Sequence, residues 1–324
     1  MLYYLFPNIA LYFNPMYAGL AAFIITALMI RVLKKSLPAD QGREFAVNGA
    51  LSKGKARGGG IIFICVYIIL ALMFVPLIPN ARWETLIYLV LTFAACLEGF
   101  LDDASKVPWG ELKKGLIDLI ICAGTAFTFY IYNGSVVRLA LFNVSFELPA
   151  VVFIILATLL LWASINVVNC TDGVDGLCGS LTLISTAGFI FILMGKDSAS
   201  VPSIIKCIIM IGVISAYLLF NCSPSTVLMG DAGSRAIGLF LGLTALETGS
   251  PLAFIPICLI FIIDGGLGLI KVALLRTVKL KILKNTRTPI HDHVRKNKGW
   301  SDTQTVTRFV IAGAFVVVLY LCFI

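Results

Sequence analysis

Residues 151–165 read VVFIILATLLLWASI and run without a charge into NVVNCTDGVDGLCGS at 166–180. An apolar run of this kind, coiled as a helix, matches the hydrocarbon core of a bilayer, and the polar residues after it then lie at the boundary with water. The whole chain has the same character, with 59% hydrophobic residues, 13% charged residues and a mean hydropathy of +0.98. These values lie far outside the range of soluble domains and predict an all-α integral membrane protein.

Stretches of about 20 apolar residues recur along the chain and predict membrane-spanning helices. We expect one polytopic domain over residues 1–324 with about ten spans, and no removable leader. The eighth span is short and almost joins the ninth. The predicted spans are 12–33, 61–79, 85–101, 115–132, 149–165, 178–195, 203–220, 236–248, 251–275 and 306–324.

The lysines and arginines predict the orientation, because they concentrate in cytoplasmic loops. With both termini outside, 21 of the 25 fall on the cytoplasmic side and four on the other. The net charge of +8 is then a signal of topology and of attraction to anionic headgroups, and no nucleic-acid partner is expected. The sequence predicts a multi-pass protein of a cytoplasmic membrane.

Polar clusters all follow spans that end on the cytoplasmic side, so we expect the chemistry on that face. The clusters are EGFLDDASK at 98–106, the stretch at 166–180, NCSPSTVLMGDAGSR at 221–235 and RTPIHDHVRKNKGW at 287–300.

Asp102 and Asp103 end an apolar helix, where a negative charge is unfavourable against the helix dipole. They predict a site for a hard cation or a catalytic base, with Lys106 nearby to hold an anion. The alternative is that they only mark the membrane boundary. Likewise, Asn169, Asp172 and Asp175 recur every third residue, so on a helical turn they would share a face and suit Mg²⁺ or a ribose and phosphate. The alternative there is a pair of Asp-Gly turns.

Asp231 is flanked by two glycines, which permit close approach of a ligand to the backbone. The only histidines of the chain, His291 and His293, lie two residues apart in a basic loop. Together with the other clusters they supply carboxylates for a cation, cations for phosphate and groups that titrate near neutral pH. Phosphoryl transfer at the level of the lipid headgroups needs this combination.

These motifs resemble those of the polyprenyl-phosphate N-acetylhexosamine-1-phosphate transferases. FLDDASK is similar to Asp-Asp-x-x-Lys, NVVNCTDGVDGL to Asn-x-x-Asn-x-Thr-Asp-Gly-x-Asp-Gly-Leu and MGDAGSRAIG to Met-Gly-Asp-x-Gly-Ser. PIHDHVRKNKGW resembles Pro-Ile-His-His-His followed by Lys-Gly-Trp, which points to the muramoyl-pentapeptide branch of the family.

The resemblance implies ten transmembrane helices, a cytoplasmic active site, Mg²⁺ dependence and a homodimer. It implies transfer of phospho-N-acetylmuramoyl-pentapeptide from UDP-N-acetylmuramoyl-pentapeptide to undecaprenyl phosphate, which gives lipid I and UMP. Asp231 would bind Mg²⁺, with Asp172 and Asp175 shared between metal and uridine. Asp102 or Asp103 would deprotonate the lipid phosphate for direct attack, although a covalent aspartyl-phosphate route is also open. His291 would be catalytic, and the expected substrate-binding residues are Lys53, Lys106, Lys114, Asn169, Asp172, Asp175 and His293.

The chain departs from the family pattern at three places. KARGGG at 55–60 stands where the family reads Thr-Pro-Thr-Met-Gly-Gly, which puts the role of Lys53 in doubt. Asp292 replaces the middle histidine, and Leu228 replaces a phenylalanine that stacks on uracil. We therefore expect nucleotide or inhibitor binding to differ from that of the family.

The ninth span contains Gly265, Gly266 and Gly268, which favour a bend and a groove for the polyprenyl chain, or else close helix packing. Asp264 in the same span should face protein or water.

Two other functions stay open. A sister enzyme would transfer N-acetylglucosamine-1-phosphate to the same lipid, and a swap of donors would reveal it. A cation transporter would place its acids inside the spans, where only Glu98, Asp118 and Asp264 qualify, and no internal repeat supports it.

Overall fold

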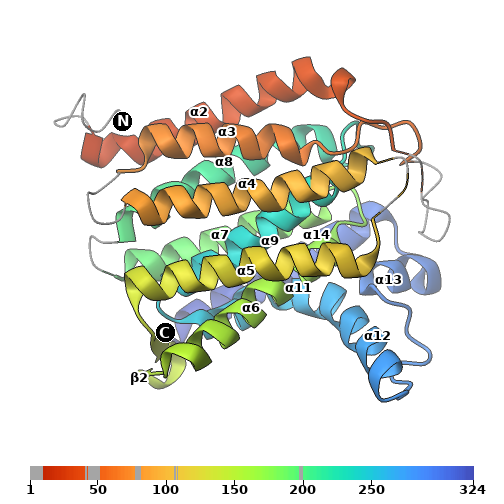
Figure 1. Cartoon of the computed structure of the whole chain (residues 1–324). Helices are drawn as coiled ribbons and strands as arrows, with labels where there is room; N and C mark the ends of the chain where they lie inside the picture. Colours follow the sequence, from red (N-terminus) through yellow and green to blue (C-terminus); the bar gives the residue numbers. More distant parts are fainter. Residues whose placement is uncertain are drawn as a thin grey trace.

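The computed structural model describes residues 10–40, 42, 52–76, 82–105, 107, 109–196 and 200–324. Long helices run roughly side by side along one direction (Figure 1). The principal helices are α2 (Ala10–Leu33), α3 (Gly60–Phe74), α4 (Arg82–Ala104), α5 (Glu111–Asn133), α6 (Ala150–Thr171), α7 (Leu177–Met194), α8 (Val201–Asn221), α9 (Gly230–Glu247), α12 (Leu267–Thr277), α13 (Ile290–Lys298) and α14 (Asp302–Cys322). The prediction of an all-α membrane protein is confirmed.

Each predicted span coincides with a helical segment, but the segments differ in how well they suit a bilayer. Seven described helices are long and apolar enough to cross a membrane, and an eighth span results if a bent pair is counted as one. Helix α3 has only 15 residues, and α9 carries charges at both ends. The number of spans and their orientation therefore stay predictions.

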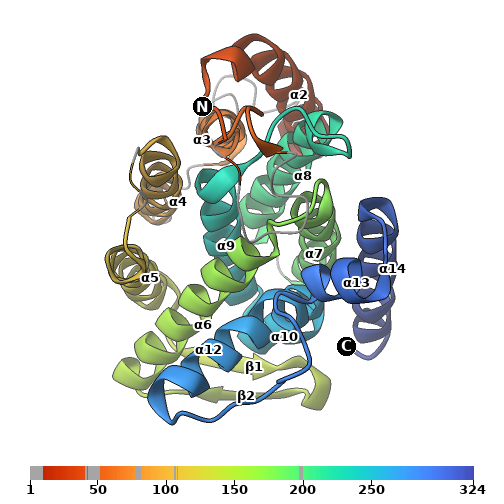
Figure 2. The same cartoon turned by 90° about the vertical axis from the view of Figure 1, so that its right-hand side faces the viewer.

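Helix α9 forms the centre of the bundle, with α4, α6 and α3 packed against it. Viewed along the bundle, α9 is surrounded by the other helices (Figure 2). Every residue from Gly230 to Leu246 is buried. The approach of α6 is close because Gly238 lies against it, where an added Cβ would be 2.5 Å from Ile165 Cα. Ser164 on α6 also donates a hydrogen bond of 2.6 Å to the Gly238 carbonyl.

The ninth apolar segment is broken and bent. It begins with η5 (Pro251–Ala253) and α10 (Phe254–Ile257), and it continues through α11 (Leu259–Phe261) and the π-helical turn η6 (Ile262–Gly266) into α12. The two parts meet at an angle of 71°. In Figure 1, α12 diverges from the other helices.

The glycines of this segment serve close helix packing, and they do not lie at the bend. A Cβ on Gly265 would be 2.5 Å from the Val167 carbonyl oxygen of α6. The angle between the two parts lies upstream of the glycines, between Ile257 and Leu259. Asp264 is completely buried against protein, which confirms that it does not face lipid.

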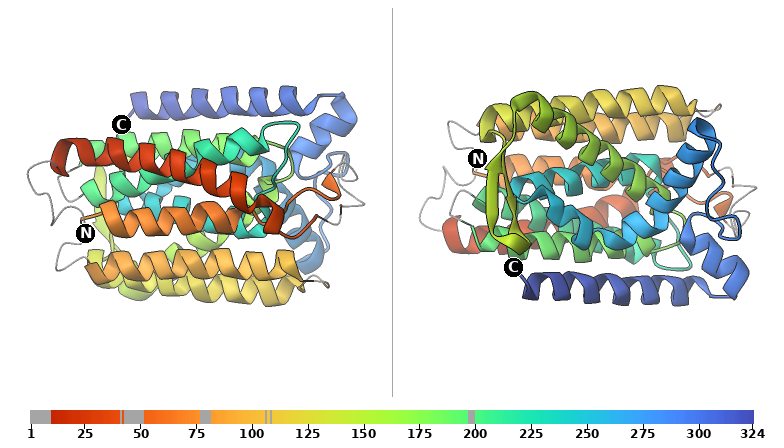
Figure 3. Two further views of the ribbon diagram at one scale, coloured as in Figure 1. Left: turned by 90° about the horizontal axis from the view of Figure 1, so that it is seen from above. Right: turned by 90° about the horizontal axis from the view of Figure 1, so that it is seen from below.

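A small hairpin that the spans did not predict lies at one end of the bundle. Strands β1 (Val136–Leu139) and β2 (Val144–Glu147) pair antiparallel and are joined by η3 (Ala140–Phe142). The hairpin is tied to the end of α9 because the Arg138 amide donates to the Gly249 carbonyl at 2.9 Å. The described termini lie at this same end, and α14 runs along the outside of the bundle (Figure 3).

Candidate active site

The ends of helices that are distant in sequence meet at the end of the bundle opposite the hairpin. There α4 ends, α5 begins, α6 turns into α7, α8 leads into α9, and α13 lies at the same end of the bundle (Figure 2). Each polar cluster that the sequence singled out is at one of these ends. The predicted site residues that the structure describes are therefore brought to one side of the molecule.

Asp102 is in the last turn of α4 and is held by two donors. Lys114 Nζ donates to its Oδ2 at 2.7 Å, and the Trp109 amide donates to its Oδ1 at 2.7 Å. Both oxygens are therefore occupied, and the side chain joins the end of α4 to the beginning of α5. Such charge-assisted hydrogen bonds fix the position of Asp102 and of the Lys114 ammonium together.

Asp231 lies in the first turn of α9, where the helix dipole favours a carboxylate. Three cations surround it, because Lys114 Nζ is 3.3 Å, Arg235 Nε 3.5 Å and Arg57 Nη2 3.9 Å from its oxygens. The charges on a phosphate group could be balanced by the same cations.

Asp103 follows Asp102 at the end of α4, and its side chain is completely buried. Its Oδ1 is 2.8 Å from Arg57 Nη2, and the Ala232 amide reaches its Oδ2 at 3.4 Å. Gly230 makes this packing possible, because a Cβ there would lie 2.0 Å from Asp103 Oδ2 and the backbone has a φ of +68°. A side chain at 230 is thus excluded by space and by conformation.

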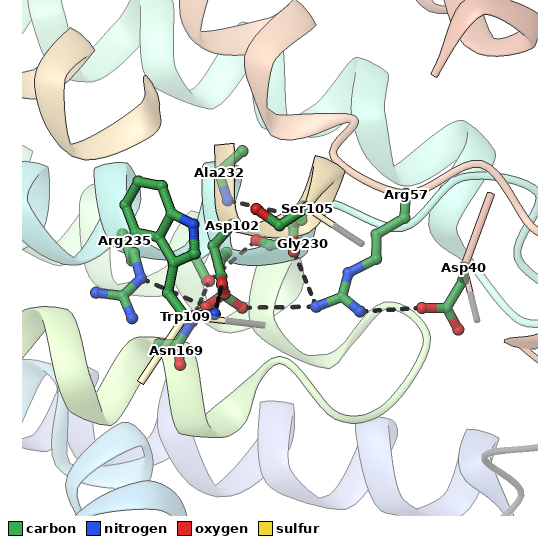
Figure 4. A network of polar contacts seen from close by, with 12 residues as sticks. Asp40, Arg57, Asp102, Ser105, Trp109, Asn169, Gly230, Ala232 and Arg235 are labelled. Atoms are coloured by element: carbon green, nitrogen blue, oxygen red, sulfur yellow. Dashed lines mark hydrogen bonds and ion pairs between the residues drawn. The ribbon is translucent and has the colours of Figure 1, made fainter. Parts of the chain in front are cut away.

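Arg57 connects two acidic groups across the site. Its Nη1 donates to Asp40 Oδ1 at 3.1 Å, and the guanidinium lies between Asp40 and the ends of α4 and α9 (Figure 4). Burial would lower its pKa, but the charges of Asp103, Asp231 and Asp40 outweigh burial and raise the pKa above its ordinary value. Arg57 therefore carries its positive charge at every physiological pH.

A buried network below Asp231 ties three helices together. Arg235 of α9 pairs with Asp118 of α5, and its Nε lies 3.2 Å from Glu98 Oε2 of α4. The same Nε is the one beside Asp231. Glu98 and Asp118 thus act on the site through Arg235, which explains why acids are tolerated inside predicted spans.

The turn after α6 presents Asp172 and Asp175 differently from the prediction. Helix α6 ends at Thr171, so Asn169, Asp172 and Asp175 do not share a helical face, and that expectation is wrong. Gly176, at a φ of +86°, ends the turn in a conformation that a continuing helix does not contain.

Asn169 and Asp175 each form hydrogen bonds with other segments, and Asp172 lies in the wall of a cavity. Asn169 donates to Ser234 Oγ of α9 at 2.9 Å. Asp175 Oδ2 accepts from the Ser225 amide at 2.9 Å and from Lys55 Nζ at 3.3 Å. Asp172 lines the cavity described below.

His291 is oriented by Asp264 from the bent segment. Its backbone amide donates to Asp264 Oδ1 at 2.7 Å, and its Nδ1 lies 2.7 Å from Asp264 Oδ2. The carboxylate accepts a hydrogen bond from Nδ1–H, and Nε2 points toward the turn after α6. A Cβ on Gly173 would be 2.3 Å from that Nε2, so glycine leaves room for the imidazole.

A cavity of about 460 Å³ opens between these elements. Its walls include both acids of the turn, His291, and two cations of the 52–59 loop, Lys55 and Arg57. Leu228, one of the three departures from the resembled motifs, lies in the wall. The mixture of cations, acids and backbone suits a charged, polar ligand such as a nucleotide diphosphate.

Of the predicted substrate-binding residues that the structure describes, Lys53, Lys114, Asn169 and His293 are not part of the cavity wall. Lys53 is exposed and is not part of the cavity wall, whereas Lys55 and Arg57 are. His293 lies beyond the wall and accepts a hydrogen bond from the Arg287 amide at 3.2 Å. Lys106 lies outside the described residues. Their substrate-binding roles stay predictions.

Two acids beside Arg57 could hold a magnesium ion only if substrate and water completed its coordination. In the described part of the chain, no three His, Cys, Asp or Glu side chains group closely enough to hold a metal ion by themselves. However, Asp103 and Asp231 both reach one nitrogen of Arg57, and Asp103 Oδ1 lacks a hydrogen bond of good geometry. Mg²⁺ is commonly held by one or two carboxylates together with phosphates and water.

Sequence reasoning missed the residues that complete the site. Arg57, Lys55 and Asp40 belong to a loop whose cations indicated topology and a departure from the family pattern, and the sequence predicted no site role for them. Arg235 was counted in the same way, although a charge one helical turn after Asp231 is a detectable signal. Nothing in the sequence linked Asp264 to His291.

Comparison of the sequence with known proteins matches the segments that carry these residues. The family model for glycosyl transferase family 4 matches residues 85–249, which include Asp102, Asp103, Lys114, Asp172, Asp175 and Asp231. The phospho-N-acetylmuramoyl-pentapeptide-transferase of Treponema pallidum (strain Nichols) is 35% identical over 313 residues, which cover 91% of this chain and 84% of that protein.

The chain belongs to glycosyl transferase family 4. Two further phospho-N-acetylmuramoyl-pentapeptide-transferases are similar over nearly their whole lengths. That of Clostridium perfringens (strain SM101 / Type A) is 31% identical and covers 94% of this chain and 92% of its own, and that of Wolbachia sp. subsp. Drosophila simulans (strain wRi) is 29% identical with 93% and 95% covered. The family resemblance found in the motifs is thus confirmed, and the chain is a membrane-bound phosphoglycosyl transferase.

Proposed function

We propose that this phosphoglycosyl transferase moves phospho-N-acetylmuramoyl-pentapeptide from its UDP donor to undecaprenyl phosphate, which yields lipid I and UMP. The observation that carries the proposal is the convergence of three acids from α4 and α9 with Lys114 and Arg57, beside a cavity lined by Asp172 and His291. The names of the relatives give the same reaction class.

Three cations of the site would bind the donor or stabilise the transferred group. The cations on the cavity wall, Lys55 and Arg57, are placed to hold the diphosphate of the donor. Lys114, fixed by Asp102, faces Asp231 and offsets the charge that develops on the transferred group.

The bonding changes are those of a phosphoryl transfer. An oxygen of the lipid phosphate forms a bond to the β-phosphorus of the donor, and the bond from that phosphorus to the α-β bridging oxygen breaks, so that UMP leaves. Asp102 would accept the proton of the lipid phosphate, because Asp103 is the residue that would hold the metal. UMP is a good leaving group, so little general acid catalysis is required.

Asp103 and Asp231 are the residues that would hold Mg²⁺. Asp172 and Asp175 line the cavity wall and would bind the nucleotide, and their share in the metal stays a prediction. The ion would supply positive charge to the diphosphate during transfer. His291, positioned by Asp264, presents Nε2 toward the ligand and would donate a hydrogen bond or exchange a proton there.

The active site is proposed to lie at the cytoplasmic face. The support is the distribution of charge along the sequence. Of the 25 lysines and arginines, 21 fall in the loops and flanks that the sequence predicts to be cytoplasmic. A homodimer is part of the same proposal and is tested by the mass of the purified protein in detergent or nanodiscs.

The proposal is tested by the release of UMP from the purified protein in detergent. The assay contains undecaprenyl phosphate, Mg²⁺ and one of two donors, UDP-N-acetylmuramoyl-pentapeptide or UDP-N-acetylglucosamine. We expect release with the muramoyl donor only, dependent on the lipid and on Mg²⁺, and lost in Asp231→Asn. Release with the glucosamine donor only would move the chain to the sister reaction, and release with neither from folded protein would refute both.

A further inference from the structure

The acids expected to do the chemistry are covered by a cation. Asp102, Asp103 and Asp231 are not among the residues that line the cavity, whereas Arg57 is. The Asp103 side chain is 0% exposed, and the Arg57 side chain in contact with it is 21% exposed. Arg57 therefore lies between the open cavity and the Asp103 carboxylate.

Arg57 occupies a position that a metal ion would also need. One nitrogen, Nη2, is 2.8 Å from Asp103 Oδ1 and 3.9 Å from Asp231 Oδ1. A single positive centre between two carboxylates is what a divalent cation provides when it bridges them. Because the Arg57 guanidinium and a metal ion would bind the same carboxylate oxygens, the presence of one weakens binding of the other.

The side chain can leave the carboxylates without rearranging the loop. The Arg57 amide donates to the Pro38 carbonyl at 2.8 Å, so the backbone is fixed. Nη1 is held by Asp40, whose Oδ2 is itself held by Ser52 and by the Gly42 amide at 3.2 Å. A rotation about the Arg57 side-chain torsions that retains the Asp40 contact would free Nη2.

We propose that Arg57 is a resident cation that covers the Asp103–Asp231 pair in the metal-free protein and that a divalent cation displaces when the site is loaded. The inference rests on the proposed function, which places Mg²⁺ at these two carboxylates. It means that metal binding also uncovers Asp103 to the cavity and releases a guanidinium at the cavity wall.

Removal of the arginine charge should strengthen metal binding. We expect Mn²⁺, used alone as a paramagnetic substitute for Mg²⁺, to bind Arg57→Gln about tenfold more tightly than the wild type, within the usual range for coupled charges. Arg57→Lys keeps the charge and should bind as the wild type does. Arg138→Gln is the matched control, because it removes one positive charge at the far end of the bundle.

The measurement is the free Mn²⁺ signal in electron paramagnetic resonance spectra of the purified full chain in detergent. Tighter binding confined to Arg57→Gln supports the proposal. Binding to Arg57→Gln that is unchanged or weaker than in the wild type overturns it, since Arg57 would then assist the metal or be remote from it.

A second measurement needs no variant and decides the matter if Arg57→Gln does not fold. Phenylglyoxal modifies accessible arginines, and peptide mass spectrometry reports the extent at each one. Addition of Mg²⁺ should increase modification of Arg57 several-fold and leave Arg295 unchanged. Arg295 is a suitable internal reference because it lines the same cavity but pairs with Asp302 at 2.7 Å and Asp292 at 3.5 Å. Unchanged or reduced modification of Arg57 overturns the proposal.

Failure of this inference can be told apart from failure of the proposed function. If the wild type releases UMP in a Mg²⁺-dependent way while Arg57→Gln binds Mn²⁺ like the wild type, only the displacement of Arg57 is refuted. If the wild type binds no Mn²⁺ at millimolar concentration, both the metal site and the inference fail.

Discussion

His291 Nδ1 lies 2.7 Å from Asp264 Oδ2, and the His291 amide lies 2.7 Å from the other oxygen of the same carboxylate. Asp264 comes from the π-helical turn η6 of the bent segment, whereas His291 begins α13. The two bonds fix both the backbone and the ring, so one aspartate sets the position and the tautomer of the imidazole.

Asp264→Asn should therefore lower the rate of UMP release by about 10²-fold, because an amide cannot accept from both donors and the ring loses its preferred tautomer. Turnover with the muramoyl donor, measured beside thermal unfolding in detergent, separates a misoriented histidine from an unfolded protein. Glu84→Gln, a carboxylate substitution at the other end of the bundle, is the control. A variant that retains full turnover would contradict the role given to this pair.

Gly173→Ala should reduce turnover through sterics alone. The added Cβ would lie 2.3 Å from His291 Nε2, so the ring or the turn must move by more than 0.5 Å, and misplacement of about 1 Å can cost about 10²-fold. Gly115→Ala on α5 is the matched control, because nothing lies within 4 Å of its added Cβ. Equal activity of the two alanine variants would show that Nε2 is not used in the reaction.

Asp231→Asn should lower turnover by about 10³-fold without unfolding the chain, because the carboxylate holds charge for the metal and the transferred group. The loss should not be recovered by raising the Mg²⁺ concentration, since the residue also organises Lys114 and Arg235. A titration of Mg²⁺ against the rate of UMP release checks this. Full recovery at high Mg²⁺ would mean that Asp231 contributes only to the affinity for the metal.

Arg235→Met should destabilise the fold as well as the site. It leaves Glu98, Asp118 and Asp231 without their shared cation in the interior, and breaking a buried ion pair typically costs about 3–5 kcal/mol. Thermal unfolding in detergent should show a clear fall in Tm. Arg276→Met, which removes an exposed ion pair with Glu111, should leave Tm nearly unchanged. Similar effects of the two substitutions would mean that the network is not a structural element.

Asp175→Asn tests the turn after α6. The carboxylate accepts from Lys55 and from the Ser225 amide, so it links the first loop to the loop before α9. We expect KM for the UDP donor to rise several-fold with a smaller change in kcat, because the wall of the cavity is loosened while Asp231 is untouched. A fall in kcat alone, measured from UMP release at saturating donor, would place Asp175 in the chemical step instead.

The amino-acid sequence determined the helices and the location of the chemistry along the chain. Long apolar stretches such as 151–165 can satisfy their backbone groups in a membrane only as helices, so their presence and type follow from local composition. The acids at 102–103 and 231 stood out because charges are costly beside such segments. These are properties of single segments and need no partner to be recognised.

The tertiary structure decided which residues meet. Asp103 and Asp231 are 128 positions apart, and their joint contact with Arg57 depends on α4, α9 and the 52–59 loop ending at one place. The prediction that Asp172 and Asp175 share a helical face is wrong because tertiary contacts hold them in a turn. There Asp175 pairs with Lys55, which is 120 residues away in the sequence. Pairings of this kind arise from packing of distant segments, and no local pattern in the sequence specifies them.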